Sequence, residues 1–153
     1  MTTEEIKTYD VNIAKLSSYL ELNKSTVLNY LSSMKRAELL HLLYADNKSV
    51  TKMQKPDKIY VHNPNMLCAL GTEQNIGTLR ECFVVNQLSV GHTVEYGQTQ
   101  GDFLIDGSIT IEVGGKDKTF DQIADIPDSY ILADSMEFPV GKKLPLWIVG
   151  LLY

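Results

Sequence analysis

Three side chains that could act together on a phosphate ester lie within one short stretch of the chain. Asp102 begins the segment DFLIDGSITIEVGGK, Glu112 stands near its end, and Lys116 follows two glycines. Carboxylate oxygens are ligands for hard cations such as Mg²⁺, and a cation beside a lysine suits phosphodiester chemistry. The pattern fits a metal-dependent phosphodiesterase site, a phosphate-binding loop, or a plain strand that leads into a turn.

The phosphate-loop interpretation fails at both of its anchor positions. A Walker A loop requires the pattern G-x-x-x-x-G-K-[ST]. Thr110 stands five residues before Gly115, where the first glycine belongs, and Asp117 follows Lys116, where Ser or Thr belongs. We therefore expect no ATP binding and no ATPase activity from this chain.

Residues 101–115 read as a β-hairpin, and the polarity of its side chains selects the register. A two-residue loop at Asp106-Gly107 would mix apolar and polar side chains on one face. A three-residue loop that also includes Ser108 instead gathers the apolar residues on one face. These are Phe103, Ile105, Ile109 and Ile111. Asp102 then lies directly opposite Glu112, with Cβ atoms about 4.5–5.5 Å apart. Two carboxylates this close repel unless a cation or a proton lies between them.

A third acid is expected on the helix that precedes the hairpin. Residues 75–89, NIGTLRECFVVNQLS, place apolar residues at helical spacing. The helical neighbours of Glu81 in this segment are Gly77, Val84, Val85 and Leu88. A carboxylate in such surroundings needs a cation or a hydrogen-bond donor, which makes Glu81 a candidate functional residue.

The remaining segments of the C-terminal half indicate a mixed sheet with helices on its faces. We expect strands at TVEYG (93–97), SYILADS (129–135) and PLWIVGLLY (145–153), and a helix at TFDQIADI (119–126). The order of helix, strand, hairpin, helix, strand and strand predicts an α+β fold.

The N-terminal half indicates a winged helix. Residues 11–20 and 25–40 carry apolar stripes at helical spacing, and Asn23 or Ser25 can cap the second helix. Strands at 39–45 and 58–63 follow, joined by a polar segment with spaced lysines. Nucleic-acid contacts are expected from Lys24, Ser25, Thr26, Asn29, Lys35 and Arg36 of the helix and from Lys48, Lys52 and Lys55 of the wing. The functional alternatives are duplex DNA binding, with the helix in the major groove, and a role in protein packing.

Charge is divided unevenly along the chain. Residues 1–70 hold nine Lys or Arg and seven Asp or Glu, whereas residues 71–153 hold five and twelve. The shift near Gly71 predicts two domains, 1–70 and 71–153. No apolar run could span a membrane, and the N-terminus has no signal-peptide pattern, so we expect a cytoplasmic protein. The histidines and cysteines make no zinc pattern.

Glu81 on a helix, Asp102 at a strand start and Glu112 on the paired strand together resemble the PD-(D/E)xK nuclease superfamily, which has the restriction-endonuclease-like fold. The resemblance covers about residues 72–153. It implies that Asp102 and Glu112 hold Mg²⁺, that Glu81 is an outer ligand, and that a lysine positions the attacking water.

The family's lysine stands two residues after the last acid, and this chain departs from the pattern there. Gly114 occupies that position, and Lys116 comes two residues later. A bulge at the two glycines would be required for Lys116 to reach back to the acids. The resemblance also suggests a nucleic-acid contact by Gln122, on the following helix.

The whole arrangement resembles the C-terminal part of a prokaryotic AAA-type ATPase family. Its members carry an N-terminal P-loop ATPase domain, a winged helix and an appended domain, and the segments GDFLIDGSITIEVGGKDKT and PLWIVGLLY carry the likeness. This implies an ATPase domain, outside this chain, as a partner. We expect a nucleic-acid-directed or regulatory module whose nuclease-like domain is degenerate. An active Mg²⁺-dependent nuclease and a protein-interaction module without DNA binding are the alternatives.

Overall fold

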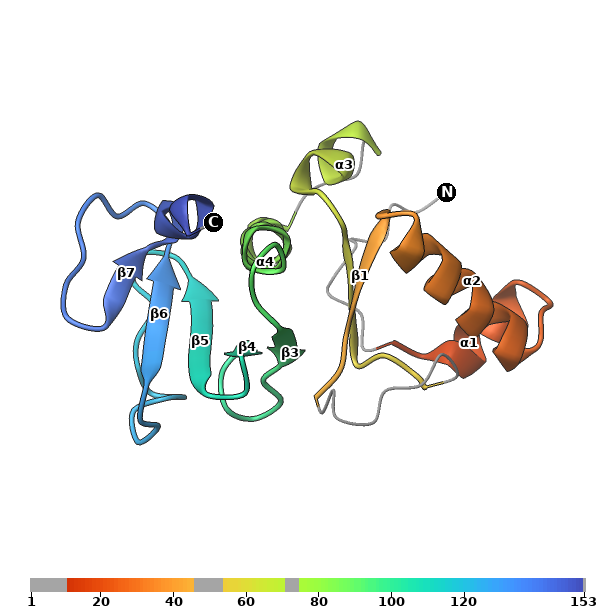
Figure 1. The fold of residues 1–153 in the computed structure, drawn as a ribbon, viewed down its shortest axis with the longest axis horizontal. Coiled ribbons are helices and arrows are strands. Elements are labelled where there is room, and N and C mark those ends of the chain that lie inside the picture. Colours follow the sequence, from red (N-terminus) through yellow and green to blue (C-terminus); the bar gives the residue numbers. More distant parts are fainter. Residues whose placement is uncertain (1–10, 46–53, 71–74, 153) are drawn as a thin grey trace.

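The computed structural model describes residues 11–45, 54–70 and 75–152. The fold is α+β, with a small antiparallel sheet and a mixed five-stranded sheet (Figure 1). The elements are, in chain order, α1 (Ile13–Tyr19), α2 (Lys24–Arg36), β1 (Leu40–Leu43), β2 (Lys58–Val61), α3 (Pro64–Ala69), α4 (Ile76–Leu88), β3 (Val94–Tyr96), β4 (Phe103–Ile105), β5 (Ile109–Gly114), β6 (Ser129–Ala133), β7 (Lys143–Pro145) and the 3₁₀ helix η1 (Leu146–Leu151).

The N-terminal elements are two helices followed by an antiparallel hairpin. Asn23 begins α2, because its side-chain oxygen accepts a hydrogen bond from the Thr26 N–H at 2.7 Å. β1 pairs with β2, so that Leu40 lies opposite Val61. A small core joins α1, α2 and the hairpin, and it consists of Val11, Ile13, Val27, Leu31, Leu42 and Tyr44. The hairpin tip, with Lys48 and Lys52, lies outside the described residues.

A short helix that the sequence did not lead us to expect follows the hairpin. α3 begins with Pro64, which suits the first turn of a helix because its missing N–H would have no partner there. The side chain of Asn63 accepts a hydrogen bond from the Asn65 N–H at 2.9 Å. None of the helices in the described ranges is long and apolar enough to cross a membrane.

The larger sheet has the strand order β3-β4-β5-β6-β7. β3, β4 and β5 are antiparallel, and β5, β6 and β7 are parallel, so the sheet is mixed as predicted. Ile105 pairs with Ile109 and Phe103 pairs with Ile111, which confirms the three-residue loop. Asp106 and Gly107 in that loop have φ of 51° and 67°.

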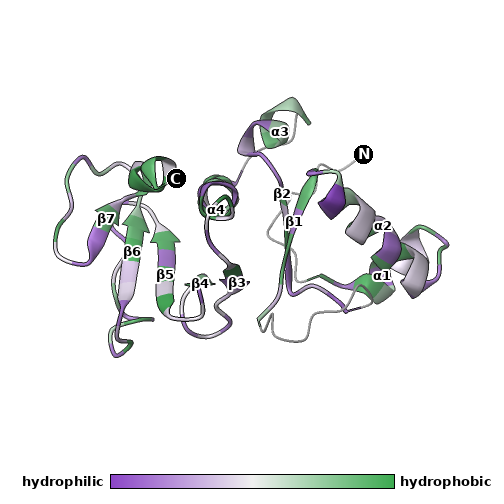
Figure 2. Ribbon diagram, viewed as in Figure 1, coloured by the Kyte–Doolittle hydropathy of each residue, from purple (hydrophilic) through white to green (hydrophobic). Residues whose placement is uncertain are grey.

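α4 lies between the large sheet and the hairpin β1–β2 (Figure 1). Its Cys82, Val84 and Val85 are completely buried. The core around them takes Leu43 and Tyr60 from the hairpin, Phe103, Ile111 and Val113 from the sheet, and Leu146 and Val149 from η1. η1 is apolar over its length, whereas α2 is mostly hydrophilic to neutral (Figure 2). The hairpin, α4 and the sheet therefore share one apolar core.

Residues 119–126 form turns rather than the expected helix. Pro127 disfavours helical backbone in the residue before it. In addition, the carbonyl groups of Ile123 and Ile126 accept hydrogen bonds from the Ser129 hydroxyl, at 3.1 and 2.8 Å. Ile123 is buried against Ile131 and Ala133 on the face of the sheet away from α4.

The final segment is also not the single strand that we expected. β7 ends at Pro145, and the chain continues as η1. Leu146 and Val149 are both buried, and residues three apart align in a 3₁₀ helix. Trp147 is 53% exposed, and its ring N–H donates to the Met136 carbonyl at 3.1 Å.

Candidate functional site

Asp102 directly precedes β4, and Glu112 lies within β5. The paired register of the hairpin ends at Phe103 opposite Ile111, and the two acids are the next residue on each strand. The backbone N–H of Asp102 donates to the Ile111 carbonyl at 2.9 Å, and its Oδ2 accepts from the Val113 N–H at 2.7 Å. The Asp102 carboxylate is therefore held against the backbone of β5.

The lysine that reaches these acids is Lys118. Its Nζ makes an ion pair with Oε1 of Glu112, a residue that is only 1% exposed. Lys116, which the sequence suggested for this role, is exposed. The backbone carbonyls of Lys116 and Lys118 both accept hydrogen bonds from Lys143 Nζ, the second at 2.8 Å. Lys143 thus holds residues 116–118, the loop segment from which the Lys118 side chain extends to Glu112.

Because Gly114 has no side chain, the Lys118 side chain has room to pass over it and reach Glu112. A Cβ atom at position 114 would lie 2.8 Å from Cβ and Cγ of Lys118 and 2.9 Å from its Cδ. Real Cβ atoms essentially never approach so closely, so a side chain at this position would displace the lysine. The absence of a side chain at position 114 and the approach of Lys118 to Glu112 are therefore two aspects of one arrangement.

Glu81 is bound by a residue from the N-terminal half. The hydroxyl of Tyr60, on β2, donates to Glu81 Oε2 at 2.7 Å. This bond supplies the donor that a carboxylate among apolar neighbours requires. Tyr60 had appeared to be only structural from the sequence.

The three acids approach the site from different sides. Ile111 and Val113 face the core under α4, so Glu112 between them points to the opposite face, where its parallel neighbour is Ile131. Glu81 belongs to α4. Within the described ranges, no group of three or more His, Cys, Asp or Glu side chains is placed to hold a metal ion. The candidate cation ligands of this site are therefore the two carboxylates of Asp102 and Glu112, and Glu81 lies outside that pair.

Burial and the neighbouring charges change the proton affinity of this site. The pKa of Asp102 is raised to about 6, with burial as the largest cause; the charges of Glu112 and Glu81 also raise it, whereas the Val113 N–H and Lys118 lower it. Burial lowers the pKa of Lys118, but its hydrogen bond to Glu112 and the three negative charges outweigh this effect and raise it overall. Lys118 is therefore charged at neutral pH. Burial, followed by Glu81, raises the pKa of Tyr60, which keeps its hydroxyl proton.

One buried atom at the site has no hydrogen-bond partner among the described residues. Oε2 of Glu112 is fully buried and unpaired, while Oε1 contacts Lys118. A buried carboxylate oxygen without a partner is costly. The unpaired oxygen and the nearby Asp102 carboxylate match the ligand preference of a hard divalent cation.

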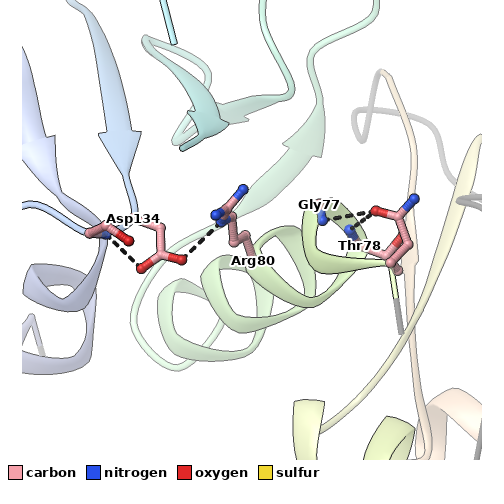
Figure 3. Close-up of polar contacts among 6 residues, drawn as sticks. Gly77, Thr78, Arg80 and Asp134 are labelled. Carbon is pink, nitrogen blue, oxygen red and sulfur yellow. Dashed lines mark hydrogen bonds and ion pairs between the residues drawn. The ribbon is translucent and has the colours of Figure 1, made fainter. Parts of the chain in front are cut away.

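A second ion pair lies beside Gly115, one residue further along. Arg80 Nε contacts Asp134 Oδ2 at 3.1 Å, and Asp134 Oδ1 accepts from the Ser135 N–H at 2.7 Å (Figure 3). At the start of α4, the Asn75 side-chain oxygen accepts hydrogen bonds from the N–H groups of Gly77 and Thr78, the two residues labelled there in the same view. A Cβ atom at Gly115 would meet Arg80 only at 3.6 Å or more, which is ordinary van der Waals contact.

The residues suggested for nucleic-acid contact are mostly exposed but lie apart from the acids in the fold. On α2, Lys24, Ser25, Asn29, Lys35 and Arg36 are exposed, and Thr26 is half-buried. Ser25 has a local role as well, because its hydroxyl donates to Asn23 Oδ1 at 2.6 Å. Lys55 is exposed near the start of β2. Gln122 is exposed within the turn segment 119–126 rather than on a helix.

Sequence reasoning missed Lys118 and Tyr60 for identifiable reasons. The signal for Lys118 was a glycine at position 114, where the resemblance implied a lysine, with a second lysine two residues beyond Lys116. Tyr60 gave no local signal, because its partner Glu81 is 21 residues away in the sequence. Comparison of the chain with protein families, with curated proteins and with solved structures gave no match.

Proposed function

We propose that this chain is a nucleic-acid-directed module in which residues 75–152 form a divalent-cation site that acts on phosphodiester bonds. The observation that carries the proposal is the ion pair of Lys118 with Glu112, with the Asp102 carboxylate held against the backbone of the same strand by the Val113 N–H. The argument for a degenerate site was the absence of a lysine at position 114. Lys118 weakens that argument, because it reaches Glu112 across Gly114.

The residues present fit a magnesium-type cation. Mg²⁺ is commonly held by one or two carboxylates, with water and substrate phosphates completing its shell. Asp102 and Glu112 would supply the carboxylates, and the unpaired Oε2 of Glu112 is the atom that most needs a cation. Such a cation, when bound, polarises a phosphoryl oxygen and makes its coordinated water more acidic. Glu81, outside the pair, fits an outer role.

Lys118 would contribute a fixed positive charge beside these acids. An ammonium group has three N–H donors, and the contact with Glu112 Oε1 occupies one of them. Its side chain is 32% exposed, so the ammonium group can also be approached from solvent. Lys118 is therefore suited to hold a phosphate oxygen or a water molecule next to Asp102 and Glu112.

The N-terminal elements would supply duplex binding in a winged-helix manner. α2 exposes polar and basic side chains, including Lys24, Lys35 and Arg36. Basic groups on a helix bind phosphates and position the helix on the duplex. We further propose that the module belongs to a larger AAA-type ATPase, whose ATPase domain is its partner.

A cleavage assay tests the cation site. Purified protein is incubated with supercoiled plasmid in Mg²⁺ or Mn²⁺, and nicking is followed for the wild type, Asp102→Ala, Glu112→Ala and Lys118→Met. The expected result is nicking by the wild type that all three substitutions abolish. Lys116→Met is the matched control and should retain activity. Nicking that depends on Lys116 instead of Lys118, or that survives in Asp102→Ala, contradicts the proposal.

A gel-shift assay tests the nucleic-acid role separately. Binding to duplex DNA should weaken as salt increases, because phosphate contacts release counterions. Replacement of Lys24, Lys35 and Arg36 together by alanine should weaken the binding further. Complete absence of salt-sensitive binding by the wild type removes the DNA-directed part of the proposal.

A second candidate function is a protein-interaction module. Large apolar side chains are exposed near the C-terminal end of the sheet: Phe138 at 74%, Val140 at 69% and Leu151 at 71%. Their chemistry suits contact with another protein surface more than contact with phosphates. Wild-type affinity for the separate ATPase domain, lost in Phe138→Ser, together with no DNA binding, would favour this candidate.

A further inference from the structure

Tyr60 is unusual because it brings a hydroxyl from the N-terminal hairpin to an acid of the C-terminal half. Its side chain is 4% exposed, and its hydroxyl donates to Glu81 Oε2 at 2.7 Å. Its ring packs edge-on against Phe103, with the ring centroids 5.9 Å apart. Phe103 follows directly after Asp102, so Tyr60 lies between the helix acid and the strand that carries the paired acid.

The neighbours of Tyr60 hold it firmly in this place. The carbonyl of Val61 accepts from Cys82 Sγ at 3.2 Å, and the carbonyl of His62 accepts from Asn86 Nδ2 at 2.7 Å. Three consecutive hairpin residues, 60–62, are thus hydrogen-bonded to α4. The position of the Tyr60 hydroxyl relative to Glu81 is therefore set by the fold of the hairpin on the helix.

We propose that Tyr60 is a positioning residue that fixes the Glu81 carboxylate at the acid site, so that the site is built from both halves of the chain. The inference rests on the proposed cation site. The Tyr60 hydroxyl binds Glu81, and its ring packs on Phe103, the residue that follows Asp102, so Tyr60 connects the two segments that carry these acids. A free Glu81 side chain would move away from the other negative charges, and the Tyr60 donor prevents this.

Hydrogen-bonding partners of the carboxylates around a metal site commonly change its affinity. Their loss typically weakens metal binding by about 10–100-fold. Glu81 is an outer group in this site, so we expect the lower end of that range for Tyr60→Phe. The substitution removes only the hydroxyl and retains the ring against Phe103.

The test is to measure Mn²⁺ affinity by isothermal titration calorimetry on the whole chain. The proteins compared are the wild type, Tyr60→Phe, Glu81→Gln and the double variant. Tyr60→Phe should weaken Mn²⁺ binding by about tenfold, and Glu81→Gln should weaken it as well. The double variant should bind like Glu81→Gln alone, because Tyr60 acts through Glu81. Tyr130→Phe, which removes a hydroxyl from the half-buried Tyr130 of β6, is the matched control and should bind like the wild type.

Wild-type affinity in Tyr60→Phe, or losses that multiply in the double variant, would overturn the positioning role. If the wild type binds no Mn²⁺, or Asp102→Asn binds as the wild type does, the proposed cation site fails instead. In that case urea unfolding of the same four proteins without metal decides the inference. A measurable coupling between the two substitutions supports the positioning of Glu81, and additive effects reject it.

Discussion

Two ion pairs lie on either side of the Gly114-Gly115 turn, and they differ in how much water reaches them. Lys118 pairs with Glu112, whose side chain is 2% exposed, whereas Arg80 pairs with Asp134, whose side chain is 38% exposed. Their basic residues come from the loop after β5 and from α4. The first pair neutralises a fully buried carboxylate, and the second neutralises a carboxylate that is partly exposed to water. The same chemistry should therefore have large consequences on one side of the turn and small ones on the other.

The largest effect is expected from Lys118→Met, which leaves the Glu112 charge buried and unpaired and so tests the difference between the two ion pairs most directly. Removal of one partner of a buried pair typically costs about 3–5 kcal/mol, and the partial exposure of Lys118 favours the lower end. We expect a loss of about 3 kcal/mol in the free energy of unfolding at neutral pH, measured in urea.

Lys116→Met serves as the control for this experiment, because Lys116 is exposed. Its effect should remain within about 0.5 kcal/mol. Addition of Glu112→Gln to Lys118→Met should recover part of the loss, since no charge is then left unpaired. Equal losses for the two lysines would show that burial does not distinguish them.

The buried side of the turn holds a second carboxylate whose charge is not fully compensated. The pKa of Asp102 is raised from 3.8 to about 6 in the folded chain. Between these pH values the folded state binds the proton more tightly than the unfolded state. Asp102 therefore favours folding below pH 4, and this contribution is lost as the pH rises to about 6.

The size of this effect is about 3 kcal/mol, at 1.36 kcal/mol for each pH unit of the window. Unfolding curves of the wild type and Asp102→Asn at pH 4, 5, 6 and 7 provide the measurement. The wild type should lose stability relative to Asp102→Asn across this range. A constant difference between the two proteins, or a gain by the wild type, contradicts the raised pKa.

The two glycines of the turn allow a test with the same substitution on each side. Gly114→Ala places a methyl group 2.8–2.9 Å from the Lys118 side chain, whereas Gly115→Ala meets Arg80 at 3.6 Å. Overpacking of this kind costs about 1–3 kcal/mol, so Gly114→Ala should destabilise and Gly115→Ala should be nearly neutral.

Urea unfolding measures both glycine variants, and Mn²⁺ titration adds a second observation. Gly114→Ala should also change Mn²⁺ affinity, because it displaces Lys118 from Glu112. If both variants have the same stability and the same Mn²⁺ affinity, the claim that Gly114 is required to make room for the Lys118 side chain is wrong.

The part of the site that follows from strand alternation could be predicted from the sequence. Only one loop length segregates polar from apolar side chains in the hairpin, and the structure has that loop, with Ile105 opposite Ile109 and Phe103 opposite Ile111. The α4 helix follows for a similar reason, because its apolar positions recur at helical spacing and Asn75 caps it. In both cases the information is local and repeated along the segment.

The parts that failed depend on contacts between distant segments. Ile123 and Ile126 have helical spacing, but the Ser129 hydroxyl binds their carbonyls and the chain turns instead. Lys118 reaches Glu112 because the loop is held by Lys143 from β7. Tyr60 reaches Glu81 only because the hairpin packs on α4. None of these contacts leaves a periodic signal in the sequence.

The smallest expected effect belongs to the pair of Arg80 and Asp134, whose carboxylate is partly exposed. Exposed ion pairs are typically worth about 0.2–1 kcal/mol, and Arg80→Gln should reduce the free energy of unfolding by an amount in that range. Because exposed charges are screened by salt, the difference should shrink between 50 mM and 1 M NaCl. The Lys118→Met loss should persist at high salt, since Glu112 remains buried. If salt removes both losses equally, the two pairs are electrostatically alike and the contrast across the glycine turn is wrong.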